Sequence, residues 1–263
     1  MDDHEVLDFC RNGYLMLERV VPEEVNAQVM EYCQEHAGDR GEIPVGEPWY
    51  VSAVTLNPAL TGVVRSLLGR DFAYLDRAAT HRSEGAQPAQ RWHRDGGAVH
   101  GPRVDCLQVF YLPQETTLEM GPTEVLPGSH HLFQQPQYMA HYERIRGAVY
   151  ASAPAGSIFV THYAIWHRRS RSVSPGVRNL LKFWYLRTTP PRRDWARCSD
   201  FTLEQAFHLP GGNSFGREMH LVRNQAAEMM YWLAGEHDVF ASVVPNSNLP
   251  VYYFWDGARP AAS

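Results

Sequence analysis

Two histidines and one aspartate limit what this chain can fold into. His93 and Asp95 lie two positions apart within residues 91–97, and His167 lies far downstream. On an extended strand, a spacing of two places both side chains on the same face, about 7 Å apart at the backbone. Two histidine nitrogens and one carboxylate can cover one face of Fe(II) and leave the opposite face open. His167 must then come from another strand or loop, which requires a closed or folded-over sheet.

Each part of this pattern also has a plain structural interpretation. Asp95 is followed by Gly96, and Asp-Gly is a strong turn dipeptide. The turn and the ligand interpretations agree if the ligands lie at a strand end just before the turn. His167 could instead be a loop histidine, and His162 is a rival ligand five residues earlier.

Arg178 favours the metal-site interpretation. It follows His167 by eleven positions and precedes an apolar strand, residues 179–186. A guanidinium at the head of a buried strand is costly without an anionic partner, and its planar fork suits a carboxylate. The alternative is a rim arginine paired to a nearby acid. Lys182 has the same strand parity as Arg178, so it should also point inward unless a bulge intervenes.

Composition and charge exclude several classes of protein. The chain has 263 residues, 44% hydrophobic and 20% charged, which is ordinary for one globular domain. A formal net charge of -5 gives no basic surface for nucleic acid or anionic lipid. We find no apolar run long enough to cross a bilayer, and residues 1–5 do not resemble a signal peptide. The four cysteines are scattered without a CxxC pair, so we expect reduced thiols in a cytoplasmic protein.

The pattern along the chain predicts helices, then a β core, then a helical extension. From about residue 71, short apolar segments are separated by Gly, Pro and Ser clusters, which indicates a β sandwich or barrel. We treat residues 1–263 as one domain, with a β core at about 71–188 and a helical extension at about 195–263. The predicted helices are 4–13, 22–38, 59–68 and 215–234. The predicted strands are 14–20, 72–82, 90–95, 104–112, 123–126, 147–152, 157–161 and 178–188.

Several stretches, in this order, resemble the Fe(II)/2-oxoglutarate dioxygenases of the phytanoyl-CoA dioxygenase (PhyH) type. Residues 9–14 and 20–25 are similar to the amino-terminal segment of that family. Residues 92–96 (Trp-His-Arg-Asp-Gly) match its iron motif, and residues 121–130 are similar to its Pro-Gly-Ser-His segment. The resemblance covers about residues 5–188. It implies a mainly β fold with flanking helices, the double-stranded β-helix or jelly-roll, cupin-like barrel.

The resemblance implies roles for five residues. His93, Asp95 and His167 correspond to the catalytic ligands of Fe(II). Arg178 corresponds to the arginine that holds the distal carboxylate of 2-oxoglutarate. Gln108 corresponds to a strand position that often faces the cosubstrate, although it could equally be a polar residue on an alternating strand.

Two further features of the sequence bear on the chemistry. Arg168 and Arg169 follow the second iron histidine, where small or hydroxyl residues are common in the family, a departure that leaves one expected cosubstrate contact open. Relatives that halogenate replace the iron carboxylate with a small residue so that chloride can bind iron. The presence of Asp95 therefore argues against halogenation.

The expected function is an oxygenase that uses Fe(II), 2-oxoglutarate and O2. It would hydroxylate an unactivated carbon of a small molecule in biosynthesis, such as an amino-acid derivative or a secondary metabolite, and release succinate and CO2. The same site could serve desaturation, epoxidation or ring formation. The main rival is a cupin-like metal-binding protein without oxygenase activity. Residues 252–255 form an aromatic cluster that either covers the site or packs the extension onto the β core.

Overall fold

The computed structural model describes residues 1–36, 44–133, 136, 141–207 and 217–243. The predicted aromatic cluster at residues 252–255 and the end of the predicted helical extension lie outside these ranges. Among the described residues, no single helix is long and apolar enough to cross a membrane. One bent pair, Pro48–Thr55 with Pro58–Leu68, meets the length and composition requirement together. The apolar side chains of its second helix are buried in the protein core.

The N-terminal part of the chain forms four helices and one short strand, β1, that joins the β core. Helix α1 (Asp3–Asn12) begins with a capping box, in which the Asp2 side chain and the Glu5 side chain each accept a hydrogen bond from the other residue's backbone N–H. It ends at Gly13, whose φ of 76° favours glycine. A Cβ at Gly13 would also lie 2.4 Å from the His130 ring. The elements that follow are β1 (Tyr14–Leu17), α2 (Glu23–Glu35), α3 (Pro48–Tyr50), the π-helical turn η1 (Val51–Thr55) and α4 (Pro58–Leu68).

Two antiparallel sheets form the β core. The larger has the strand order β1-β6-β3-β8-β2, and the smaller has the order β5-β4-β7. Residues 87–93 extend the smaller sheet, because backbone bridges join Gln87 to Ser172 and His93 to His167. The strands are β2 (Ala73–Glu84), β3 (Cys106–Leu112), β4 (Thr123–Leu126), β5 (Val149–Tyr150), β6 (Ser157–His162), β7 (Trp166–Arg169) and β8 (Val177–Leu186).

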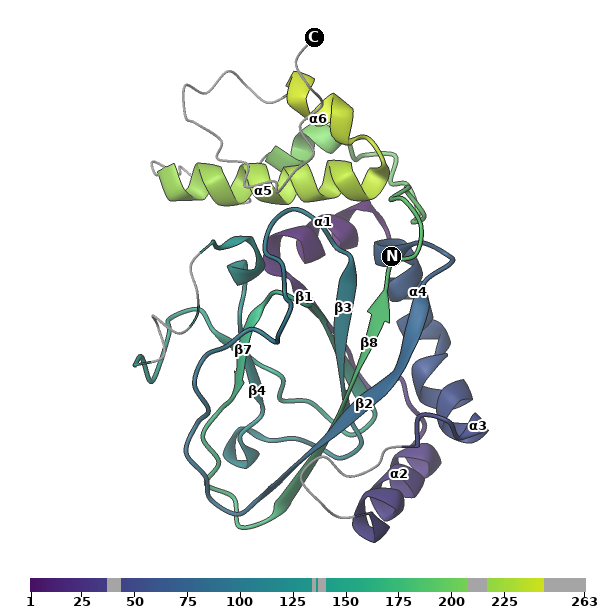
Figure 1. Cartoon of the computed structure of the whole chain (residues 1–263), viewed down its shortest axis with the longest axis vertical. Helices are drawn as coiled ribbons and strands as arrows, with labels where there is room; N and C mark the ends of the chain where they lie inside the picture. Colours follow the sequence, from purple (N-terminus) through teal and green to yellow (C-terminus); the bar gives the residue numbers. More distant parts are fainter. Residues whose placement is uncertain (37–43, 134–135, 137–140, 208–216, 244–263) are drawn as a thin grey trace.

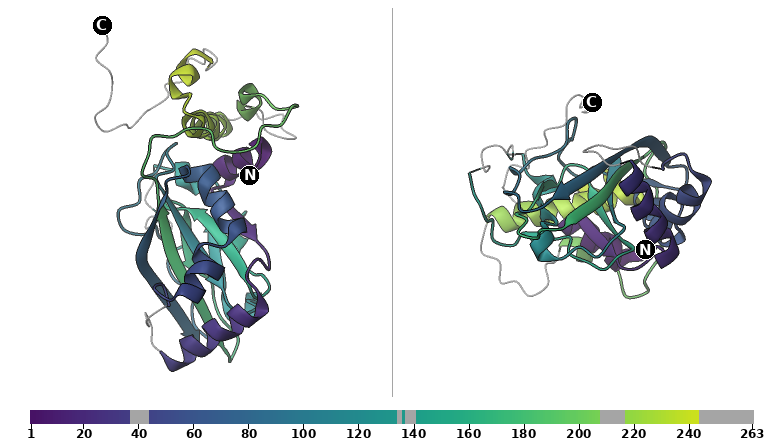
Figure 2. Two further views of the ribbon diagram at one scale, coloured as in Figure 1. Left: turned by 90° about the vertical axis from the view of Figure 1, so that its right-hand side faces the viewer. Right: turned by 90° about the horizontal axis from the view of Figure 1, so that it is seen from below.

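The larger sheet has an apolar core on each face. Alternate side chains of its strands, such as Val109 and Phe183, pack toward the helices. The intervening ones, such as Phe110 and Leu180, pack with Val125 of the smaller sheet. The two sheets therefore face each other, and α2, α3 and α4 lie outside the larger one (Figures 1 and 2). Polar side chains that share the parity of Phe110 or Leu180 must point into the space between the sheets.

The C-terminal helices cover one end of the two sheets. Helix α5 (Arg217–Ala234) lies across this end above α1, with α6 (His237–Val243) beyond it (Figure 1). The 3-10 helix η5 (Leu203–Phe207) contacts α5. Two arginines of the β core, Arg187 and Arg103, stack over Trp232 of α5 at 4.7 and 5.7 Å from its ring. Helix α5 is therefore anchored to the β core by cation–π contacts as well as by apolar packing.

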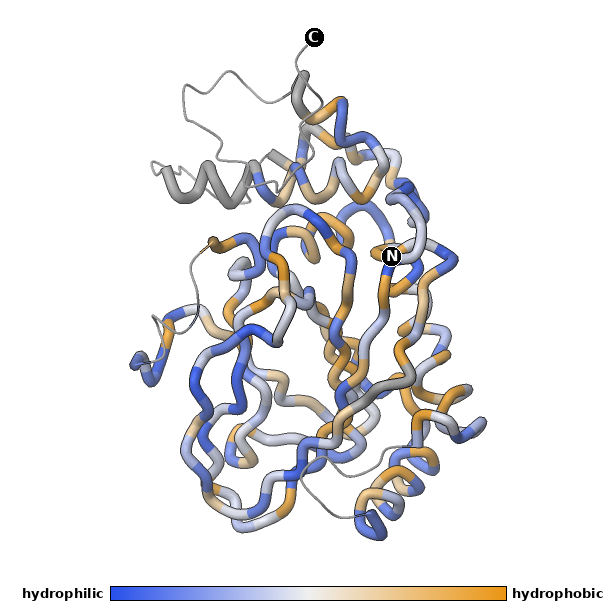
Figure 3. Tube along the Cα trace, viewed as in Figure 1, coloured by the Kyte–Doolittle hydropathy of each residue, from blue (hydrophilic) through white to orange (hydrophobic). Residues whose placement is uncertain are grey.

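The sequence pattern and the structure differ in two places that matter for the site. Residues 90–95 form no regular strand, and only His93 makes a ladder bridge. Strand β7, which carries His167, was not predicted, because Trp166–Arg169 shows no apolar alternation. Figure 3 shows that hydrophilic residues follow the connection between β2 and β3, whereas hydrophobic residues concentrate on the helices and strands that face one another.

Candidate active site

Three side chains of the kinds that bind metals meet between the two sheets. The segment with His93 and Asp95 runs beside β7, and His93 and His167 exchange two backbone hydrogen bonds of 3.0 Å. Their imidazole ring centroids are 4.4 Å apart. The Oδ1 atom of Asp95 lies 3.9 Å from His93 Nε2 and 3.6 Å from His167 Nε2. The three ligand atoms are all within 4.8 Å of one another, which suits a single ion.

The two imidazoles present the same nitrogen to this point. His93 Nδ1 lies 2.9 Å from the Arg91 carbonyl oxygen, and His167 Nδ1 lies 3.1 Å from the Ile165 carbonyl oxygen. A carbonyl only accepts hydrogen bonds, so Nδ1 carries the proton in both rings and Nε2 keeps its lone pair. Burial, followed by the charge of His167, lowers the pKa of His93. This favours the neutral imidazole, the form that binds metals.

Asp95 presents one oxygen to the histidines and the other to two donors. Lys182 Nζ donates to Oδ2 at 2.7 Å, and the Gln108 side-chain amide donates to the same oxygen. Burial alone would raise the pKa of Asp95, but the hydrogen bond and charge of His167 when its ring is protonated, and the charge and hydrogen bond of Lys182 in either case, hold it well below its usual range. The carboxylate is therefore ionised, and Oδ1 is the atom left for a metal.

Adjacent strands of the larger sheet supply these two donors. Lys182 on β8 pairs in register with Phe110 on β3, and Gln108 on β3 pairs with Trp184 on β8. Lys182 is only 7% exposed and points inward, as its strand parity with Arg178 predicts. Gln108 is fully buried, and its Oε1 atom has no hydrogen-bond partner among the described residues.

Arg178 lies on the same inner face of β8, four residues before Lys182. Its side chain is 2% exposed, and its Nε and Nη1 atoms have no hydrogen-bond partner among the described residues. Burial lowers the pKa of Arg178 to about 10, and the charge of Arg169 acts in the same direction. At the rise of a β-strand, four residues span about 13 Å. A buried guanidinium with two orphaned donors fits a small carboxylate between it and the ligand cluster.

The two arginines that follow His167 point to opposite sides of the smaller sheet. Arg168 is buried on the outer side, where its Nε donates to Glu124 at 2.6 Å and its guanidinium lies 4.5 Å from the Trp92 ring. Arg169 shares the parity of His167 and donates to the backbone carbonyl of Pro88 at 2.9 Å. The Arg168 side chain therefore points away from His93, Asp95 and His167, although Arg168 follows His167 directly in the sequence.

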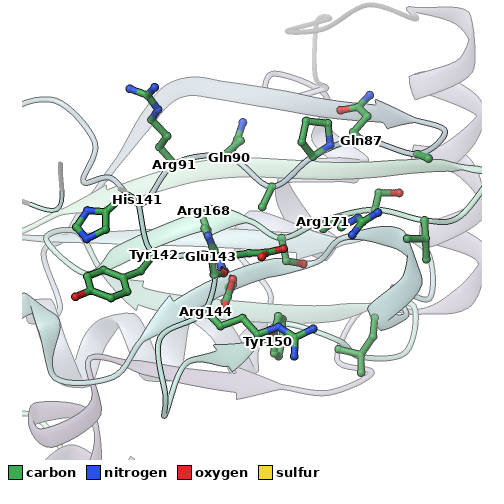
Figure 4. A pocket seen from close by; sticks show the side chains of 18 residues that line it. Gln87, Gln90, Arg91, His141, Tyr142, Glu143, Arg144, Tyr150, Arg168 and Arg171 are labelled. Carbon is green, nitrogen blue, oxygen red and sulfur yellow. Dashed lines mark hydrogen bonds and ion pairs between the residues drawn. The ribbon is translucent and has the colours of Figure 1, made fainter. Parts of the chain in front are cut away.

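A cavity of about 1020 Å³ lies over the outer side of the smaller sheet. Figure 4 shows Gln87, Gln90 and Arg91 on one wall and residues 141–144 on another, with Arg168 between them. The lining contains none of the three ligand residues. This cavity is therefore distinct from the space between the sheets that holds the ligand cluster.

The rival histidine, His162, belongs to a different group. Its Nε2 lies 2.8 Å from the Arg103 carbonyl oxygen, and its Nδ1 accepts a hydrogen bond from the Ala164 N–H. It packs 4.9 Å from His130, which packs 3.9 Å from His131. All three histidines are buried, and His130 and His131 hold the loop after β4 near α1 through the Cys10 carbonyl. The sequence pattern presented His162 only as a rival ligand and did not predict its contact with His130 and His131, which lie far from it in the sequence.

Comparison with known proteins gives the family. The model of the family described as phytanoyl-CoA dioxygenase (PhyH) matches residues 9–180 of this chain. The chain belongs to the phytanoyl-CoA dioxygenase family. The expected family and its dioxygenase class are thereby confirmed. This match ends at residue 180, two residues beyond Arg178, and so spans all the predicted site residues.

Solved structures share the fold at low sequence identity. HygX from Streptomyces hygroscopicus, with nickel and 2-oxoglutarate bound, has a TM-score of 0.60 and 15% identity over 76% of this chain and 93% of its own. EctD from S. alaskensis, with bound Fe, has a TM-score of 0.57 and 18% identity over 74% of this chain and 80% of its own. The 2-oxoglutarate-dependent epimerase SnoN from nogalamycin biosynthesis has a TM-score of 0.56 and 15% identity, over 81% and 88%. These likenesses confirm the expected double-stranded β-helix fold class.

One curated relative is a mycobacterial protein. Rv1501 of Mycobacterium tuberculosis is 28% identical over 97 residues, which is 37% of this chain and 34% of that protein. This chain therefore matches about a third of the length of that relative.

Proposed function

We propose that this chain is an Fe(II)- and 2-oxoglutarate-dependent oxygenase that hydroxylates an unactivated carbon of a small molecule. Each turnover would consume O2 and 2-oxoglutarate and release succinate and CO2, with one oxygen atom in the product hydroxyl and one in succinate. One observation carries the proposal. One ligand atom from each of His93, Asp95 and His167 lies within 4.8 Å of the other two, and Arg178 presents a buried guanidinium on the same inner surface, with two donors that have no partner among the described residues.

The donor set fits ferrous iron. Two neutral imidazole nitrogens and one carboxylate oxygen would hold the ion on one side and leave its other positions free for small ligands. The backbone carbonyls behind both histidines orient the rings and raise their basicity. When bound, iron and 2-oxoglutarate supply the oxidising power that breaks an unactivated C–H bond.

Lys182 and Gln108 act through Asp95 as positioning residues. Both donate to Oδ2, so this oxygen is occupied and Asp95 would bind the metal through Oδ1 alone. A carboxylate fixed in this way leaves the remaining coordination positions free. The predicted contact of Gln108 with the cosubstrate stays a prediction, and its orphaned Oε1 is the atom available for such a contact.

Arg178 is the residue that would receive the cosubstrate. A guanidinium paired with the distal carboxylate would satisfy its orphaned donors and remove the cost of burying an unpaired charge. Apolar residues of the inner core, including Phe110, Val125 and Leu180, surround this space and exclude water.

The substrate class and the setting complete the proposal. We infer a mid-sized small molecule, such as an amino-acid derivative or a secondary metabolite, and a role in biosynthesis. SnoN, which shares the fold, belongs to nogalamycin biosynthesis. We also propose that residues 1–263 act as one domain. A cytoplasmic location agrees with all four cysteines being free.

Other outcomes at the same carbon remain alternatives within this proposal. Desaturation, epoxidation and ring formation need the same metal site and differ in how the substrate is placed. The rival without oxygenase activity, a cupin-like metal-binding protein, has no use for a buried guanidinium near its metal. Arg178 therefore argues against that rival.

The proposal is tested first without a substrate. Apoprotein is mixed anaerobically with Fe(II) and then with 2-oxoglutarate, and the visible spectrum is recorded. We expect the metal-to-ligand charge-transfer band of the iron–2-oxoglutarate chelate, and a protein that binds iron without this band would be the cupin-like rival. Succinate release is then screened against candidate compounds made by neighbouring genes, and mass spectrometry of the product separates hydroxylation from its alternatives.

A further inference from the structure

A second group of metal-binding side chains lies at the start of α1, remote in sequence from the proposed iron ligands. It consists of His4 on α1 and of Cys198 and Asp200 in the segment that leads from β8 to the C-terminal helices. One ligand atom from each side chain lies within 4.8 Å of the other two. The two segments meet here although more than half of the chain separates them, so the fold itself builds the cluster.

The neighbouring Asp3 fixes both segments. Its carboxylate accepts hydrogen bonds from Trp195 Nε1 at 2.7 Å and from the Cys198 backbone N–H at 2.8 Å, and it pairs with Arg193. Asp3 is 1% exposed, so these contacts are shielded from water. His4 also stacks edge-on against Phe201, with centroids 5.1 Å apart. The ligands are therefore held near one another before any ion binds, which lowers the entropic cost of binding.

We propose that His4, Cys198 and Asp200 form a zinc site, with water as the fourth ligand. An imidazole, a thiolate and a carboxylate are the donors that Zn(II) takes in tetrahedral sites. Bond lengths in such sites place adjacent ligand atoms about 3.5 Å apart. The His4 Nε2 to Asp200 Oδ1 distance is 3.7 Å. Binding releases the thiol proton of Cys198, so the bound unit carries a thiolate.

The donor types distinguish this cluster from the proposed iron site. The iron site has two nitrogens and one oxygen, whereas this cluster includes sulfur, which favours Zn(II) over Fe(II). His4 and Asp200 are exposed, so an ion has direct access from solvent. A bound ion would clamp the start of the C-terminal extension to α1, against which α5 also packs. The site would therefore strengthen the attachment of the C-terminal helices, which cover one end of the two sheets.

Cobalt absorption tests the site separately from the iron site. The full chain with His93→Ala, which disables the proposed iron site, is freed of metal and titrated with Co(II) under reducing conditions. A thiolate ligand produces a sulfur-to-cobalt charge-transfer band in the near ultraviolet, whereas a site of histidine and aspartate alone does not. We expect one equivalent of Co(II) to produce this band and Zn(II) to remove it.

Four variants, each with His93→Ala, assign the ligands. Cys198→Ser should abolish the band, and His4→Ala and Asp200→Asn should each weaken Co(II) affinity by at least about tenfold. The matched control is Cys106→Ser, because Cys106 is also half-buried but lies on β3 and outside the cluster. It should keep the band. No band without further substitution, or a band that survives Cys198→Ser, would overturn the proposal.

A thermal melt provides a second readout. With excess Zn(II), the Tm of the His93→Ala protein should rise by roughly 5 °C, because the ion binds only the folded state. The rise should be absent when Cys198→Ser is added. The melting curve of that variant without metal also shows whether it folds. An equal rise in both proteins would assign the zinc to other ligands and contradict the proposal.

Discussion

Two groups of histidines lie in the β core, and they use opposite ring nitrogens. His93 and His167 donate Nδ1–H to backbone carbonyls and direct Nε2 at a shared carboxylate. His130, His131 and His162 place Nε2 on backbone carbonyls instead. In the first group, the Nε2 lone pairs converge and can bind a metal. In the second group, Nε2 is already hydrogen-bonded to the backbone and cannot. Burial alone therefore does not identify a histidine as a metal ligand. The hydrogen-bond partner of each ring nitrogen does identify it.

Removing one histidine from each group should give the largest contrast. His93→Ala should reduce succinate formation to background and abolish the charge-transfer band, because two ligands cannot hold the iron. His131→Ala should leave that band in place and instead lower the free energy of unfolding, since it removes a buried ring that contacts α1. Anaerobic titration and urea unfolding of both variants measure the contrast. Unchanged turnover in His93→Ala would refute the iron assignment.

Acid should destabilise the protein through the structural group. Burial lowers the pKa of His131 and of His162 to about 4 and that of His130 well below its usual value. The unfolded state, with histidine pKa values near 6.5, therefore binds more protons below that pH. The free energy of unfolding should fall as pH drops from 6.5 toward 4, by up to about 1.4 kcal/mol per pH unit for each histidine.

Urea unfolding between pH 7 and pH 5 checks this slope, in a range where few carboxylates titrate. The variant His131→Phe removes one of the three titrating histidines. The slope of its free energy of unfolding against pH should therefore be smaller by the contribution of one proton. A slope that stays the same in this variant would mean that His131 is not buried in its neutral form.

Two arginines, Arg178 buried and Arg94 half-buried, extend the comparison from histidine rings to guanidinium groups. Arg94 donates to the backbone carbonyls of Ala164, Ser129 and Leu132, whereas two donors of Arg178 have no partner in the part of the chain that the structure describes. We expect Arg178→Met to raise the KM for 2-oxoglutarate by about 10- to 100-fold, as loss of a charged hydrogen-bond partner does. The same change should not destabilise the apoprotein, because it removes an unpaired buried charge.

Arg94→Met serves as the matched control. It should cost roughly 1–3 kcal/mol of stability, since three carbonyls lose their donor, and leave the KM for 2-oxoglutarate near its original value. Steady-state kinetics and urea unfolding of the two variants separate these effects. The comparison fails if Arg94→Met raises this KM as much as Arg178→Met does.

The smallest effect is expected at Gln108. Gln108→Leu keeps the size of the side chain and the charge of Lys182 but removes one donor to Asp95. Fe(II) affinity should fall by about tenfold, as for other partners that orient metal ligands. The KM for 2-oxoglutarate at saturating Fe(II) should change little. A change in this KM alone would instead support the family-derived expectation that Gln108 contacts the cosubstrate.

Much of the fold follows from local pattern. Thr123–Leu126 was predicted with the same bounds as strand β4, and the end of α1 follows from Gly13. Strand β7 could not be predicted, because its outward arginine is buried by an ion pair with Glu124 from another strand. Such a partner is visible only after folding. The same limit explains why residues 90–95, which were predicted as a strand, form none. They lie beside β7, but only His93 makes a ladder bridge to it.

The candidate site shows a similar division. Ligand types and spacing, together with the family resemblance, pointed to His93, Asp95, His167 and Arg178, and the structure brings the first three together. Strand parity also predicted that Lys182 points inward. Its contact with Asp95 Oδ2 could not be predicted, because it depends on the register between β3, β8 and the loop before them. The sequence pattern predicts which face of a strand a side chain lies on, but its contact partner depends on how the strands pack.

Anomalous diffraction at the iron absorption edge, from crystals grown anaerobically with Fe(II) and 2-oxoglutarate, tests the central claim most directly. We predict one strong iron peak bonded to His93 Nε2, His167 Nε2 and Asp95 Oδ1, with the far carboxylate of 2-oxoglutarate on Arg178. A peak beside His130, His131 and His162, or no peak between the sheets, would contradict the proposed oxygenase site.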